Sequence, residues 1–141
     1  MTGNCEDCAH TFKIEIFHCG FGDTCYAYCD RCGRTAILSL WSQQWPAGVK
    51  GSQAEIPGEM EQHLAACECG GRFAKGNSPR CPSCGEPLSA DNAAEYLEAQ
   101  APGTKLGWRW QRNWTGLYCA VIDGKQVLDN FKRIPVTDEE P

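Results

Sequence analysis

Four close pairs of cysteines constrain this chain more than any other feature of its sequence. The pairs are Cys5-Glu-Asp-Cys8, Cys29-Asp-Arg-Cys32, Cys67-Glu-Cys69 and Cys81-Pro-Ser-Cys84. Leu, Ile, Val and Phe together supply only 23 of the 141 residues, which is too few for an ordinary hydrophobic core. The total of 11 cysteines is odd, which disfavours a closed disulfide framework. We therefore expect a small fold that bound metal holds together.

The spacing of the pairs predicts two tetrahedral zinc sites with four thiolates each. We expect the pairs to combine in chain order, with Cys5, Cys8, Cys29 and Cys32 at site 1 and Cys67, Cys69, Cys81 and Cys84 at site 2. Zinc binding of this kind contributes about 10 kcal/mol to folding, so we expect the chain not to fold without metal. Iron in a rubredoxin-like site and a metal-free cluster of reduced thiols are the alternatives.

Glycine follows the second cysteine of three pairs, at Gly33, Gly70 and Gly85. A glycine at this position permits a turn whose backbone amides point at the sulfur atoms.

The cysteine pairs resemble the knuckles of zinc-ribbon families, whose C-P-x-C-G pattern Cys81-Pro-Ser-Cys84-Gly85 matches as it stands. The resemblance covers residues 5–42 and 67–88. The chain departs from the pattern at Ala9, which replaces a glycine, and at Cys67-Glu-Cys69, which is one residue short. The resemblance implies a small β-sheet braced by zinc. It leaves the function open, because zinc ribbons serve as nucleic-acid binders, protein adaptors and structural inserts in enzymes.

Alternating apolar residues predict β-strands around the cysteine pairs. Phe12, Ile14 and Ile16 share one face, and Tyr26 and Tyr28 resume the period of two after a glycine-rich turn. We therefore expect a hairpin between the first two cysteine pairs, followed by a covered third strand over residues 34–41. A tight ribbon hairpin is expected around residues 72–77, between the last two pairs.

The predicted fold class is α+β: a small β-rich protein with two zinc-ribbon or knuckle modules, one amphipathic helix and a C-terminal antiparallel β-meander. Ser89 can cap the amphipathic helix, and Asp123-Gly124 predicts a hairpin turn within the meander. The expected segments are a zinc ribbon (1–42), a linker with a short helix at 57–66 (43–66), a second zinc knuckle (67–88), the helix and meander (89–134) and an acidic tail (135–141). We slightly favour one compact domain over two.

Three cysteines lie outside the four pairs. Cys119 sits in an apolar segment and is expected to be a small core residue. Cys19 and Cys25 flank the predicted turn, and we expect them to be reduced structural thiols; a thiol or redox enzyme that uses both is an alternative. Four thiolates saturate each predicted zinc ion and leave no position for water, so we expect a protein that is not an enzyme.

The formal net charge of -5 favours binding to a basic protein partner over binding to phosphate. We therefore expect a protein-protein interaction module, such as an adaptor, regulator or inhibitor, with no membrane contact. The start of the chain lacks the regions of a secretory signal, so we expect a cytoplasmic location.

Binding to single-stranded RNA or DNA is the alternative function. Residues 102–134 carry a local charge of +4. Within this basic segment, aromatic and cationic side chains alternate, which is typical of single-strand binders; the candidate contacts are Trp108, Arg109, Trp110 and Arg112.

Overall fold

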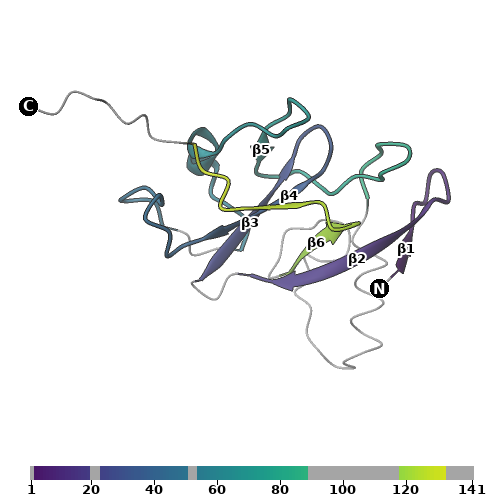
Figure 1. The fold of residues 1–141 in the computed structure, drawn as a ribbon, viewed down its shortest axis with the longest axis horizontal. Coiled ribbons are helices and arrows are strands. Elements are labelled where there is room, and N and C mark those ends of the chain that lie inside the picture. Colours follow the sequence, from purple (N-terminus) through teal and green to yellow (C-terminus); the bar gives the residue numbers. More distant parts are fainter. Residues whose placement is uncertain (1, 20–22, 51–53, 89–117, 133–141) are drawn as a thin grey trace, which may run out of the picture.

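The computed structural model describes residues 2–19, 23–50, 54–88 and 118–132, which form two β-sheets with very little helix (Figure 1). The three-stranded sheet has the order β1-β2-β6, with β1 at Thr2–Asn4, β2 at Thr11–His18 and β6 at Tyr118–Ile122. The four-stranded sheet has the order β5-β3-β4-β7, with β5 at Phe73–Ala74, β3 at Thr24–Cys29, β4 at Thr35–Ser39 and β7 at Gln126–Leu128. The β-rich character is confirmed, whereas the amphipathic helix predicted after Ser89 lies outside the described residues.

The hairpin predicted between the first two cysteine pairs is wrong. β2 pairs antiparallel with β6, and its register places Ile14 opposite Ile122. β3 instead pairs antiparallel with β4, with Tyr28 opposite Thr35. β4 corresponds to the third strand that was predicted over residues 34–41. The chain therefore changes sheets between β2 and β3. An alternating pattern identifies a strand and its faces, but it carries no information about which strand will be its neighbour.

The turn predicted at Asp123-Gly124 is present, but it does not make a hairpin. Both residues have positive φ, 49° and 70°, and the Lys125 N–H donates to the Ile122 carbonyl at 2.9 Å. Such a turn suits Asp-Gly. The strands on its two sides nevertheless join different sheets, because β7 runs parallel to β4. The predicted meander is therefore wrong for this part, and residues 106–117 lie outside the described residues.

Hydrogen bonds from β3 and β4 cover the second edge of β6 and join the two sheets. The Thr35 hydroxyl donates to the Ala120 carbonyl at 2.7 Å, and the Ala120 N–H donates to the Tyr28 hydroxyl at 3.0 Å. Tyr26 and Tyr28 are buried on the same side of β3, together with Phe12 of β2. The faces predicted for these aromatic residues are confirmed.

The short helix predicted near residue 60 is present as a 3-10 helix, η1 (Gly58–His63). Met60 and Leu64 are buried in an apolar cluster that also contains Phe73 of β5 and Leu38 of β4. Beyond β7 the chain returns to this helix, since the Lys132 N–H donates to the His63 carbonyl at 2.9 Å. Across the described ranges, no helix has the length and apolar character needed to cross a membrane.

Candidate metal centres

The eight paired cysteines gather into two groups of four, and within each group the sulfur atoms lie within 4.8 Å of one another. The outer cluster consists of Cys5, Cys8, Cys81 and Cys84, and the inner cluster consists of Cys29, Cys32, Cys67 and Cys69. The closest Sγ–Sγ distances are 3.5–3.6 Å. Four thiolates around a tetrahedral zinc, each about 2.3 Å from the metal, lie about 3.8 Å apart, whereas a disulfide requires about 2.05 Å. Each cluster therefore suits a four-thiolate metal site.

The structure corrects the predicted division of the cysteines between the two sites. The predicted site 1 joined Cys5 and Cys8 to Cys29 and Cys32, which depended on a hairpin between them. The first pair lies instead in the turn between β1 and β2. The second pair spans the end of β3 and the turn that leads to β4, in the other sheet. The first pair therefore joins the fourth, and the second joins the third.

The three cysteine pairs with two intervening residues each form the same type of backbone turn. In each turn the N–H of the first cysteine donates to the carbonyl five residues later, and the N–H of the fourth residue after it donates back to its carbonyl. This fourth residue has positive φ in every case: 64° at Ala9, 72° at Gly33 and 77° at Gly85. The role predicted for the two glycines is confirmed. Ala9 adopts the same left-handed conformation with a side chain in place.

The remaining pair, Cys67-Glu-Cys69, closes a similar turn that is one residue shorter. The Cys67 N–H donates to the Gly71 carbonyl and the Gly70 N–H donates to the Cys67 carbonyl, both at 2.9 Å. Gly70 has φ of 91°, as predicted for a turn glycine. A Cβ atom on Gly71 would lie 2.5 Å from Cys29 Sγ, so the backbone approaches the inner cluster closely. The importance of Gly71 was not predicted, although the doubled glycine in the sequence is a usable signal.

Backbone amides point at one sulfur atom in three of the turns. The N–H groups of Arg31, Gly71 and Ser83 lie 3.4 Å from the Sγ atoms of Cys29, Cys69 and Cys81, respectively. These contacts confirm the prediction that the knuckle turns direct amides at sulfur. They stabilise the negative charge of a thiolate, which is the form that binds a metal.

The thiols of each cluster differ in their readiness to ionise. Burial opposes ionisation of Cys69, but hydrogen bonds from the Gly71 amide and from neighbouring thiols lower its pKa to about 7. Burial likewise opposes ionisation of Cys81, and amide hydrogen bonds from Cys84 and Ser83 outweigh it to lower the pKa to about 7. Burial raises the pKa of Cys67 to about 12. Metal binding would therefore displace protons from the more resistant thiols.

Arg80 connects the outer cluster to the inner one. Its guanidinium donates to the Gly85 carbonyl at 2.9 Å and to the Asp30 carbonyl at 3.4 Å. The backbone is also close at this point, because a Cβ atom on Gly33 would collide with the backbone nitrogen of Arg80. A knuckle of each cluster is thus packed against a knuckle of the other.

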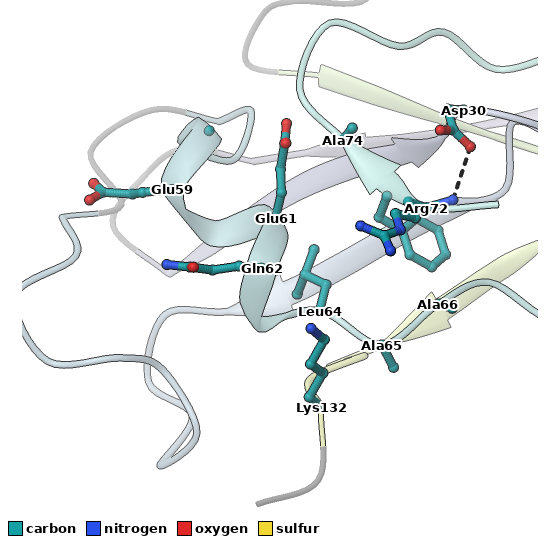
Figure 2. Close-up of a pocket in the computed structure, with 12 residues that line it drawn as sticks. Asp30, Glu59, Glu61, Gln62, Leu64, Ala65, Ala66, Arg72, Ala74 and Lys132 are labelled. Atoms are coloured by element: carbon teal, nitrogen blue, oxygen red, sulfur yellow. Dashed lines mark hydrogen bonds between the residues drawn. The ribbon is translucent and has the colours of Figure 1, made fainter.

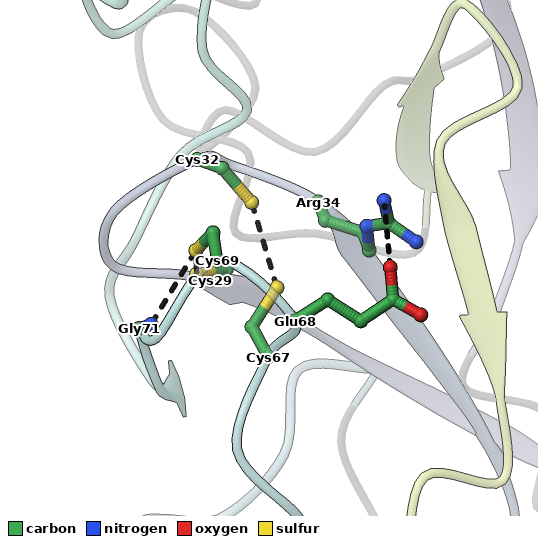
Figure 3. A network of polar contacts seen from close by, with 7 residues as sticks. All are labelled: Cys29, Cys32, Arg34, Cys67, Glu68, Cys69 and Gly71. Carbon is green, nitrogen blue, oxygen red and sulfur yellow. Dashed lines mark hydrogen bonds and ion pairs between the residues drawn. The ribbon is translucent and has the colours of Figure 1, made fainter.

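An ion pair spans the inner cluster. Arg34 lies 3.8 Å from the carboxylate of Glu68, which projects from the short knuckle (Figure 3). Glu68 is 84% exposed, so water screens most of this attraction.

The three remaining cysteines are buried, and Cys19 lies against Cys119, with a distance of 3.7 Å between the sulfur atoms. The core position predicted for Cys119 is confirmed. The hydrogen bond with Cys119 lowers the pKa of Cys19, while burial raises the pKa of Cys25 to about 12. Cys19 thus hydrogen-bonds to the thiol of Cys119, whereas the redox alternative paired it with Cys25.

The candidate nucleic-acid contacts lie outside the part of the chain that the structure describes; they are Trp108, Arg109, Trp110 and Arg112. This alternative therefore stays a prediction.

Comparison with known proteins adds one match. The model of a family described as Domain of unknown function (DUF8255) matches residues 1–90, a stretch that contains all eight cysteines of the two clusters. No curated protein and no solved structure matches the chain.

Proposed function

We propose that this chain, which belongs to the family described as Domain of unknown function (DUF8255), is a non-catalytic zinc-binding protein that acts as a protein-protein interaction module. The observation that carries the proposal is the donor set, since among the residues that the structure describes each cluster is made of four cysteine sulfurs. Thiolates are preferred ligands of zinc, and a closed tetrahedral set leaves no position for water or substrate. Two zinc ions in such sites stabilise a fold and carry out no chemistry.

A metal-braced surface suits partner binding because little of it has to become ordered when the partner arrives. Trp41 and Leu128 are exposed at 81% and 67%, and they are the exposed large hydrophobic residues of the described part of the chain. Their segments are hydrogen-bonded, since the Ser39 N–H donates to Asp129 Oδ1 and the Trp41 N–H donates to the Ser39 hydroxyl. Leu128 lies on β7, at the edge of its sheet. An exposed tryptophan beside an edge strand favours contact with another protein.

A reducing compartment agrees with this proposal, because it keeps the eight sulfurs available to metal. We accordingly propose a cytoplasmic location.

Metal analysis and partner capture test the proposal together. The purified full chain should contain two zinc ions, and the zinc-loaded protein should capture a protein partner from its host that the Trp41→Ala variant captures poorly. A well-folded sample without bound metal would contradict the proposal. A labelled single-stranded oligonucleotide is the contrasting probe at low and moderate salt. Saturable binding that Trp110→Ala or Arg112→Ala weakens would favour the nucleic-acid alternative.

A further inference from the structure

A groove of about 640 Å³ lies between η1 and β5, and none of the residues that line it is a cysteine (Figure 2). Its walls include the apolar residues Leu64, Ala65, Phe73 and Ala74. A groove of this volume falls within the range of known ligand sites, which is about 300–1,000 Å³.

The edge of a β-sheet forms one wall of the groove. β5 is the end strand of the four-stranded sheet and, among the described strands, pairs only with β3. Both of its residues, Phe73 and Ala74, line the groove. The outer backbone edge of such a strand can hydrogen-bond to an extended peptide that adds to the sheet.

Two cations from distant parts of the sequence converge on the same space. The guanidinium of Arg72 and the ammonium of Lys132 both point into the groove in Figure 2. Neither side chain makes an ion pair within the described residues.

Two of the carboxylates that line the groove accept hydrogen bonds from the backbone on either side of β5. Asp30 accepts a hydrogen bond from the Arg72 N–H at 2.9 Å, and Glu61 accepts one from the Lys75 N–H at 2.8 Å. These two bonds hold the ends of β5 in place. The side chain of Glu59 points away from the groove in Figure 2. A ligand in the groove thus meets an apolar wall, a strand edge and two cations, with the carboxylates of Asp30 and Glu61 at the two ends of β5.

We infer that this groove binds an extended acidic segment of a protein partner, which lies along β5 with a carboxylate between Arg72 and Lys132. The inference rests on the proposed interaction function and names the partner chemistry at one surface. The formal net charge of -5 gives an acidic ligand no long-range attraction. Binding therefore depends on the two local cations and weakens as salt screens them.

The test uses the zinc-loaded full chain and a blocked pentapeptide of alternating valine and glutamate. Amide NMR signals of Phe73 and Ala74 should shift saturably on addition of the peptide. The same peptide with glutamine in place of glutamate should bind about tenfold more weakly, because charge-assisted hydrogen bonds are lost. Arg72→Gln and Lys132→Gln should each weaken binding of the glutamate peptide about fivefold to tenfold.

Lys13→Gln on β2 is the matched control, since it removes one exposed cation from the other sheet and should leave peptide affinity unchanged. All three variants should retain two zinc ions, because within the described residues Arg72, Lys132 and Lys13 hydrogen-bond through backbone groups, which glutamine keeps.

Several results would overturn the inference: equal binding of the two peptides, equal loss in Lys13→Gln, or free glutamate that binds as tightly as the peptide. Oligonucleotide binding that requires Arg72 would also overturn it. If Arg72→Gln still captures the native partner while Trp41→Ala does not, this groove is not the docking site but the proposed function stands. If the zinc-loaded chain captures no protein at all, the proposed function fails instead.

Discussion

The outer and inner clusters each consist of four cysteine sulfurs, but they hold together very different lengths of chain. The outer cluster joins two long knuckles, the first beginning at Cys5 and the second ending at Cys84. In the sequence, the cysteines of the inner cluster lie between these two knuckles, from Cys29 to Cys69. In both clusters the first cysteine of each pair is buried and the second is exposed. The surroundings differ, because the inner cluster is crowded by Gly71 whereas nothing lies within 4 Å of a Cβ atom placed on Gly85. The buried cysteines of both clusters thus pack in the apolar core, and the backbone is more crowded around the inner cluster.

The largest effects should come from removing one sulfur from each cluster. Cys29 is fully buried at the end of β3, opposite Phe73, whereas Cys84 is exposed. Cys29→Ser should destabilise the chain by about 5 kcal/mol or more, because it removes a ligand and disturbs the core together. The zinc content should then fall from two ions to none. Cys84→Ser should lose only the outer zinc and keep the β3-β4 pairing.

Elemental analysis and circular dichroism of both variants measure this difference. Complete removal of zinc from the unaltered chain by a strong chelator should unfold both sheets and serves as the reference state. If Cys84→Ser also loses both ions, the clusters form a single cooperative unit, and the proposed hierarchy between them is wrong.

A smaller loss of stability should come from substitutions that test the contact between the knuckles of the two clusters. Gly33 and Gly85 both have positive φ, but only a Cβ atom on Gly33 would collide with the Arg80 backbone. Gly85→Ala should cost about 1 kcal/mol from backbone strain alone. Gly33→Ala should cost about 3 kcal/mol, because the Arg80 segment must also move. Denaturant unfolding with excess zinc compares the two, and equal losses would show that the packing of one knuckle on the other adds little stability.

The comparison also shows what could be predicted from the sequence. The eight ligands and the turn glycines depend on local spacing, and the structure confirms both the two four-sulfur groups and the turns. The division of ligands could not be predicted, because it depends on which strands pair. β2 pairs with β6, which lies about a hundred residues further along the chain. A period of two carries no information about such a distant partner.

The turn at Asp123-Gly124 also shows that local sequence does not determine which strands pair. Its local chemistry predicts the observed backbone conformation, and Lys125 closes it as expected. The next strand nevertheless pairs with β4, because Thr35 and Tyr28 already hydrogen-bond to the second edge of β6. Tertiary contacts, rather than the turn, decide where β7 goes.

Ala9→Gly should stabilise the outer cluster by about 0.5 kcal/mol. Ala9 has φ of 64°, a conformation that costs a residue with a side chain about 1–2 kcal/mol, and the added flexibility of the unfolded chain offsets part of the gain. The measurement is denaturant unfolding beside Gly85→Ala, which makes the reverse change in the other outer knuckle. A loss of stability in both variants would show that the two knuckles do not need the same conformation at this position.

The smallest effect is expected at the ion pair of the inner cluster. Glu68→Ala should change stability by less than about 0.5 kcal/mol, because an exposed carboxylate 3.8 Å from Arg34 gains little over its hydration. Glu68→Gln is the matched control, since it removes the charge and keeps the length of the side chain. Both variants should unfold at nearly the same denaturant concentration as the unaltered chain, at low and at high salt. A larger loss that high salt abolishes would mean that charge around the short knuckle, in addition to its tight backbone, holds Cys67 and Cys69 in place.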